Sequence, residues 1–169
     1  MKSVWGLLML GISALGISTL GISTLAAGGA SDLPEGVQHW TAADLKAKSP
    51  ALQQKAASDA NRSASEKLVE YPNDYFLEVY RDKDGVPELH ETEADIFIVQ
   101  SGTATLIVGG TLENAETVSP GEKRKGTIKG GTKVTLNAGD IARIPAKTPH
   151  QVLMVKAPFN YLVIKVKGY

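Results

Sequence analysis

From position 75 onward the sequence is a succession of short β-type runs separated by turn-forming residues. The runs span residues 75–81, 96–100, 103–108, 133–136, 141–144, 151–155 and 161–166. Glycine-containing turn signals separate them, as at positions 84–85, 109–110 and 138–140. No helical periodicity appears between the runs, which argues against a parallel βαβ sheet. The pattern therefore predicts an antiparallel all-β sandwich or barrel.

The size and charge of the chain narrow its function classes. A length of 169 residues suits one domain with a hydrophobic core. Lys plus Arg equals Asp plus Glu at 18 each, so the net charge does not attract nucleic acid, and no nucleic-acid partner is expected. Lys123, Arg124 and Lys125 form a local basic cluster, which we interpret as a solvated loop in preference to a phosphate site.

Residues 1–30 have the composition of a secretory signal peptide. Lys2 precedes a long uncharged apolar stretch, and small residues follow near Ala26. An uncleaved membrane anchor is the rival interpretation, because the apolar stretch is long. We favour cleavage, which leaves no stable membrane span, and expect a periplasmic or secreted protein. The chain contains no cysteine, so disulfides and thiolate metal ligands are excluded.

Residues 31–73 are predicted to form a helical N-terminal arm ahead of a barrel at 74–169. Thr41 and Asp44 have the spacing of a helix N-cap with an acidic third residue. Pro50 is expected to end that helix or to start another, which would continue to Ser65. His39 and Trp40 are more readily explained as anchors of the arm than as chemical groups.

Two stretches within the β-rich part carry histidines, PELHETEADIFIVQSG at 87–102 and GDIARIPAKTPHQV at 139–152. Glu88 and His90 stand two apart in an extended segment, so their side chains should lie on the same face of a strand. His150 should begin a strand after the turn formed by Thr148 and Pro149. Either the face of Glu88 meets water, or the two side chains bind something.

Both stretches resemble the conserved motifs of the cupin family. Gly139, Pro145 and His150 match the second motif, with Lys147 in place of its second glycine. The first motif, His-x-His followed by Glu and Gly, has the counterpart Glu88-x-His90-x4-Asp95-x6-Gly102. An alternative register with His90 and Thr92 in the two histidine places breaks the spacing to Gly102. Thirty-six residues separate Gly102 from Gly139, a spacing that cupins accommodate.

The resemblance implies an all-β fold, a single cupin-type barrel (a double-stranded β-helix, or jelly roll). It also implies that Glu88, His90, Asp95 and His150 converge inside the barrel on one divalent metal ion. Two imidazoles with carboxylates suit Fe, Mn or Zn. A metal-free interpretation stays open, in which His90 pairs with Glu88 or Asp95 in a buried network. A turn-capping role for Asp95 is an equal alternative.

Two function classes follow from the resemblance. The first is an exported metal-dependent enzyme acting on a small oxygenated substrate, of isomerase, lyase or dioxygenase type, with Glu88 as a candidate general base. The second is a metal-free module that binds a sugar or a small acid. Arg81, Arg143 and Tyr161 are candidate substrate-binding residues, although solvent-facing arginines are the preferred interpretation. The connection at 109–131 is either a lid or a plain hairpin, and cupins often form homodimers.

Overall fold

The computed structural model describes residues 33–168, so the signal-peptide prediction lies outside the described residues. The chain divides into two units, residues 1–39 and 40–169. In the first unit, Val37 N donates a hydrogen bond to Pro34 O at 3.0 Å. The second unit contains one helix and eleven strands within the described residues, and it holds both motif segments.

The second unit begins with helix α1 and continues as strands. The elements are α1 (Ala42–Ala57), β1 (Ser63–Glu70), β2 (Asp74–Arg81), β3 (Glu88–His90), β4 (Glu93–Val108), β5 (Thr111–Glu113), β6 (Glu116–Ser119), β7 (Glu122–Arg124), β8 (Thr127–Lys129), β9 (Thr132–Asn137), β10 (Ile141–Ile144) and β11 (His150–Lys167). The prediction of an antiparallel all-β domain is therefore confirmed.

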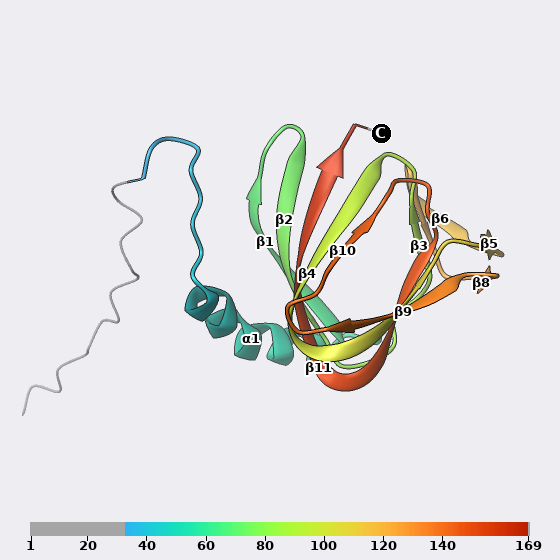
Figure 1. The fold of residues 1–169 in the computed structure, drawn as a ribbon, viewed down its shortest axis with the longest axis horizontal. Helices are drawn as coiled ribbons and strands as arrows, with labels where there is room; N and C mark the ends of the chain where they lie inside the picture. Colours follow the sequence, from blue (N-terminus) through green and yellow to red (C-terminus); the bar gives the residue numbers. More distant parts are fainter. Residues whose placement is uncertain (1–32, 169) are drawn as a thin grey trace, which may run out of the picture. The chain divides into compact units, whose positions relative to one another are not determined.

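Two long strands, β4 and β11, organise the barrel. β11 pairs antiparallel with β2, β3 and β4, and β4 also pairs with β9 and β10. Both strands curve strongly around the barrel (Figure 1). Each is continuous where the sequence predicted a break, because the chain bends through bulges without leaving the ladder. At the bend of β4, Gly102 has φ +84° and lies against the backbone of β11. A Cβ added there would lie 2.3 Å from Pro158 O.

The N-terminal part differs from its prediction in two respects. α1 runs through Pro50 as one helix, because Pro50 is exposed and the carbonyl it frees can bind water. The predicted helix to Ser65 is wrong, since residues 63–70 form β1 and pair with β2. The predicted boundary at 73–74 therefore falls between two paired strands. The Thr41–Asp44 capping box is present, with both of its hydrogen bonds.

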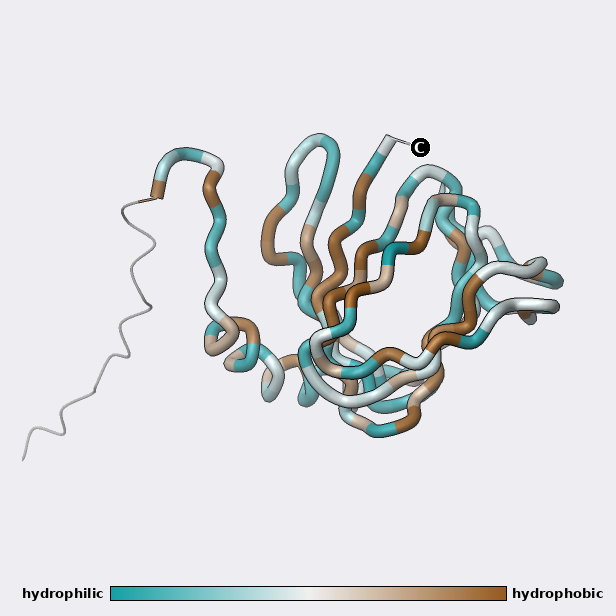
Figure 2. The backbone as a smooth tube through the Cα atoms, in the orientation of Figure 1, coloured by the Kyte–Doolittle hydropathy of each residue, from teal (hydrophilic) through white to brown (hydrophobic). Residues whose placement is uncertain are grey.

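Alternation along the strands separates an inner face of the barrel from an outer one. Hydrophobic and hydrophilic residues alternate along the barrel strands in Figure 2. Inward residues of β2, β4 and β11 form the main core, which includes Val79, Phe97 and Val163. On the outer face, Tyr80 of β2 packs in a second cluster beneath α1. The inner face is the one that carries the motif residues.

The connection at 109–131 is neither a plain loop nor a single hairpin. β5 pairs with β8, and this two-stranded sheet projects from one end of the barrel (Figure 1). Between them, β6 pairs with β7, and β7 pairs with β3. The connection thus adds a strand beside the first motif. Across residues 33–168, no helix has the length and apolar character needed to cross a membrane.

Candidate functional site

The barrel encloses an open cavity of about 170 Å³. Its wall combines apolar side chains with ionisable ones, which come from β1, β2, β3, β4, β7 and β11. The ionisable or hydroxyl-bearing side chains are Ser63, Ser65, Arg81, Glu88, Asp95, Arg124, His150, Tyr161 and Lys165. A larger hollow of about 590 Å³ lies between α1 and the residues Gln100, Ser101 and Asn160, but no histidine or carboxylate lines it. The carboxylates Glu88 and Asp95 and the imidazole of His150 line the barrel cavity instead.

Both motif histidines are buried, and His150 lines the cavity. His150 Nδ1 lies 3.1 Å from Thr148 O, and His90 Nδ1 lies 2.6 Å from a carboxylate oxygen of Glu122. A carbonyl only accepts, so Nδ1 of His150 carries the proton and donates it. The contact with the Glu122 carboxylate favours a protonated Nδ1 in His90 as well. The two ring centroids lie 5.2 Å apart, and Nε2 of each ring faces Asp95.

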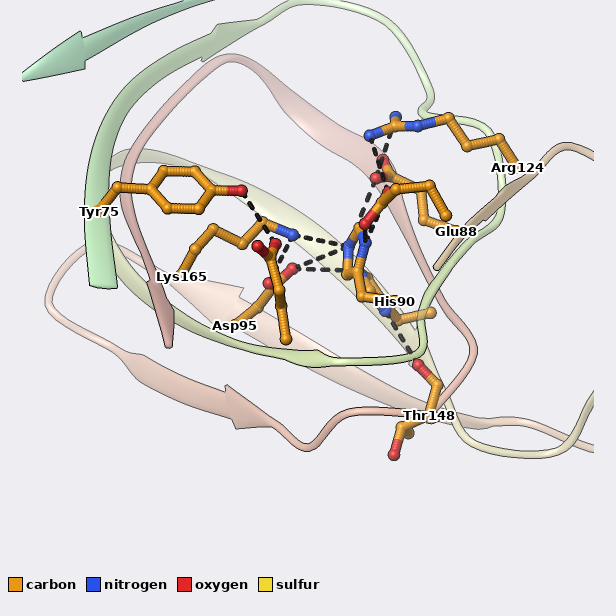
Figure 3. A network of polar contacts seen from close by, with 10 residues as sticks. Tyr75, Glu88, His90, Asp95, Arg124, Thr148 and Lys165 are labelled. Atoms are coloured by element: carbon orange, nitrogen blue, oxygen red, sulfur yellow. Dashed lines mark hydrogen bonds and ion pairs between the residues drawn. The ribbon is translucent and has the colours of Figure 1, made fainter. Parts of the chain in front are cut away.

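Asp95 connects the two histidines, and Lys165 completes the cluster (Figure 3). Asp95 Oδ2 lies 3.3 Å from His90 Nε2 and 3.4 Å from His150 Nε2. Lys165 Nζ lies 2.6 Å from Asp95 Oδ1 and 2.7 Å from His90 Nε2. Strand register explains the meeting, because Lys165 on β11 stands opposite Asp95 on β4. A side-chain ammonium thus contacts two of the four residues of the predicted metal site, Asp95 and His90.

The surroundings shift two pKa values in this cluster. Burial alone would raise the pKa of Asp95, but its contacts with His150 and His90 and the charge of Lys165 hold it well below its usual range. Burial lowers the pKa of His90, but Asp95 and Glu122 outweigh burial and raise it. In the 2.7 Å contact with Lys165, however, the ammonium donates and His90 Nε2 accepts, so His90 is neutral in this arrangement.

Glu88 forms the outer edge of the cluster. Its Oε2 lies 3.0 Å from Arg124 Nη1 and 3.8 Å from His90 Nε2. Arg124 and Glu122 come from β7, which pairs residue for residue with β3, so Arg124 stands opposite Glu88 and Glu122 opposite His90. The sequence interpretation missed Glu122 and left Arg124 in a solvated loop. No local signal indicates either role, since the pairing of β7 with β3 joins distant segments.

The cluster fits a single metal ion in its donor set and spacing. One donor atom each from Glu88, His90 and His150 lies within 4.8 Å of the others. An ion with bonds of about 2.0–2.2 Å joins donors up to about 4.4 Å apart, so small side-chain movements suffice. Asp95 is outside this set, but its carboxylate touches both imidazoles. An ion at His90 Nε2 requires the Lys165 ammonium to swing away on its flexible chain.

The three candidate substrate residues separate in the structure. Arg81 and Tyr161 line the cavity, so the preferred interpretation of Arg81 as solvent-facing is wrong. Tyr161 and Lys165, four residues apart on β11, share a face, and that face is the inner one. Arg143 is exposed on β10, whose inward residues are its neighbours Ala142 and Ile144, and it does not line the cavity. Arg81, Tyr161 and Lys165 are therefore the residues to add to the motif cluster.

Comparisons with known proteins concern the fold. No family model matches the chain, and no curated protein sequence matches it. The chain is similar to the solved structure of SPY1581, a conserved protein of unknown function from Streptococcus pyogenes, with 16% identity and a TM-score of 0.50, over 83% of this chain and 99% of that one.

Two further solved structures carry descriptive names. One is a protein with a double-stranded β-helix domain from Klebsiella pneumoniae, with 18% identity and a TM-score of 0.49, over 66% of this chain and 76% of that one. The other is a cupin-2 domain protein from Shewanella frigidimarina, with 19% identity and a TM-score of 0.43, over 62% and 80% respectively. The antiparallel barrel built on β4 and β11 is the architecture that the resemblance of the two motifs to cupins implied.

Proposed function

We propose that the barrel binds one divalent metal ion between Glu88, His90 and His150. The observation that carries this proposal is the mutual approach of their donor atoms within 4.8 Å in the barrel, where both histidines are buried. The proposal retains Asp95 as a fourth participant, as a further carboxylate ligand of the ion. The contacts of Asp95 Oδ2 with Nε2 of both imidazoles support this role.

The contacts behind the histidines support the proposal. Metal-binding histidines usually donate their second ring N–H to a carboxylate or a carbonyl, which fixes the tautomer and the ring orientation. His90 has Glu122 in this place, and His150 has Thr148 O. Both arrangements leave Nε2 as the inward donor atom. Two imidazoles with carboxylates suit Fe, Mn or Zn better than Cu(I).

The bound ion would act as a Lewis acid on an oxygen atom of a small ligand in the cavity. The chain's own residues would surround that ligand with an apolar wall that includes Leu77, Phe97 and Val163. If Asp95 bound the ion in place of Glu88, Glu88 would accept a proton from the small molecule in the cavity. Export to the periplasm or beyond the cell belongs to this proposal and is supported by the composition of residues 1–30 alone.

A second candidate function is a metal-free barrel that binds a small acid or a sugar. The position of Lys165 favours it, because an ammonium 2.7 Å from His90 Nε2 and 2.6 Å from Asp95 Oδ1 already supplies a cation to the cluster. In this alternative the polar residues form a satisfied internal network. The cavity then binds its ligand without an ion.

Elemental analysis of the purified protein, after equilibration with Fe, Mn and Zn in turn, distinguishes the two functions. We expect about one ion per chain in the parent protein and a loss of that ion in His90→Ala and His150→Ala. His39→Ala is the matched control, because the chain has only three histidines and His39 is the one outside the cluster. A parent protein without an ion contradicts the metal proposal and favours the metal-free barrel.

A further inference from the structure

Arg81 is a buried arginine without an anionic partner. Its side chain lines the cavity, and the residue is 9% exposed. Within residues 33–168, Arg81 forms no ion pair, and its Nε has no hydrogen-bond partner. The two carboxylates that line the same cavity are engaged elsewhere, Glu88 with Arg124 and Asp95 with Lys165. One positive charge inside the barrel is therefore left over.

A buried charge that lacks a partner costs free energy, so its retention calls for a physical reason. The neighbouring polar group is the hydroxyl of Tyr161. Burial raises the pKa of that hydroxyl, and the charge of Arg81 opposes the rise without reversing it. A neutral hydroxyl does not balance a guanidinium. The site instead offers two donor groups, a guanidinium and a phenol, at one wall of the cavity.

We infer that Arg81 and Tyr161 bind the carboxylate of a small organic acid inside the barrel. The planar guanidinium matches the two oxygens of a carboxylate, and the phenol adds a third hydrogen bond. Leu77, Val79 and Val152 supply an apolar wall for the hydrocarbon part of the acid. A cavity of about 150 Å³ holds a molecule of the size of benzene, so about 170 Å³ suits an acid of roughly four to eight non-hydrogen atoms.

The charge balance favours a carboxylate over a phosphate. With Glu88 and Asp95 already paired, Arg81 contributes one uncompensated positive charge, which a monoanion neutralises. A phosphate dianion would bring a second negative charge into a cavity that also contains two carboxylates. The guanidinium also lies close to the backbone at Gly85, where an added Cβ would be 3.0 Å from Arg81 Nη1. That contact limits the size of the group that Arg81 can bind.

The proposed acid site shares the cavity with the histidine cluster but has no residue in common with it. On β2, Tyr75 stands opposite Lys165 and Arg81 stands opposite Phe159. Arg81 therefore lies near the end of β2 away from the position that pairs with Lys165. The inference rests on the proposal that the cavity binds a small ligand, but it does not depend on a bound ion. Failure of the metal proposal and failure of this one can therefore be told apart.

The test measures binding of acetate, glycolate and pyruvate by NMR titration and by the shift of the melting temperature. We expect at least one of these acids to bind the parent protein after treatment with EDTA. We expect Arg81→Met to lose about tenfold or more in affinity. Arg81→Lys should lose less, because lysine keeps the positive charge but cannot donate two parallel hydrogen bonds to a carboxylate. Tyr161→Phe should lose a smaller factor.

The controls address charge, folding and the ion. Arg143→Met removes an exposed arginine from the outer face and should leave binding unchanged. The uncharged amide of the acid that binds should bind at least tenfold more weakly than the acid. Unfolding curves identify any variant that fails to fold, and Arg81→Lys then takes the place of Arg81→Met. Four results overturn the inference: no acid binds the parent, Arg81 variants bind equally well, inorganic phosphate binds better than every acid, or binding requires an added metal ion.

Discussion

Two buried carboxylates on opposite faces of the sheet have opposite ionisation behaviour. Asp95 on the inner face and Glu78 on the outer face are exposed by only 3% and 1%. Asp95 lies among His90, His150 and Lys165, and its pKa is held well below the usual range. Burial raises the pKa of Glu78 to about 7, although Gln100 Nε2 donates a hydrogen bond to it at 2.7 Å.

The difference teaches that partners, and not burial, decide the charge of a carboxylate in this protein. Asp95 has a cation at 2.6 Å and two imidazoles at 3.3 and 3.4 Å, so its desolvation is offset. Glu78 has one neutral donor, and the nearest basic residue, Lys48, is already paired with Glu66 at 2.6 Å. The inner face is built to hold charge, whereas the outer face holds a group that can be neutral.

The largest effect is expected from Asp95→Ala. Removal of the carboxylate leaves Lys165 buried without its partner, and this should lower the free energy of unfolding by about 3–5 kcal/mol. Urea denaturation with EDTA present measures the loss. Glu116→Ala is the matched control, because Glu116 and Lys125 also pair at 2.6 Å but at an exposed position. A loss no larger than that of the control would mean that Lys165 finds another partner.

A pH-dependent effect of intermediate size is expected from Glu78. Its folded-state pKa is raised above that of the unfolded chain, so its contribution to stability is greatest below about pH 4.5 and decreases as the pH rises towards 7. The parent protein should therefore lose up to about 3 kcal/mol relative to Glu78→Gln across that window. Urea denaturation at pH 4.5 and pH 8 measures the difference between the two proteins. Parallel pH profiles for both would contradict a raised pKa.

Local pattern predicted the fold class, and the resemblance to the cupin motifs implied the meeting of the motif residues. Turn signals and alternation predicted the strands, and the resemblance implied that Glu88, His90, Asp95 and His150 would come together. The structure brings these four side chains into one cluster. The inward orientation of Arg81 could also have been predicted, because Arg81 follows Leu77 and Val79 at the two-residue spacing of the inner face.

Long-range pairing explains what the pattern could not predict. Lys165 enters the cluster because β11 stands in register with β4, and Glu122 enters because β7 pairs with β3. Neither register can be read from nearby residues. Residues 63–70 contain alanine, glutamate and lysine, which favour helix, but pairing with β2 makes them a strand. The composition of a short polar segment does not decide between a helix and a strand.

A smaller effect on the inner face is expected from Lys165→Met. Loss of the ammonium frees His90 Nε2 and removes a positive charge from the proposed metal site, so zinc affinity should rise by about tenfold or more. Titration of zinc against a competing chelator measures the affinity of the parent and the variant. Lys67→Met, at an exposed position, is the control for charge and should leave the affinity unchanged. Equal affinities for Lys165→Met and the parent would show that the lysine does not compete with an ion.

The smallest effect is expected from Lys67→Met itself, measured as stability. Hydrogen bonds from Lys167 and Lys67 lower the pKa of Glu70 to about 2, a large shift at a fully exposed carboxylate. Solvent and salt screen such a pair, and Lys167 remains 2.8 Å from Glu70 after the substitution. We therefore expect no measurable change in the melting temperature at physiological salt. Lys67→Met could instead lower the melting temperature as much as Asp95→Ala does. A lowered carboxylate pKa would then indicate a stabilising ion pair at exposed and buried positions alike, and burial would not explain the importance of Asp95.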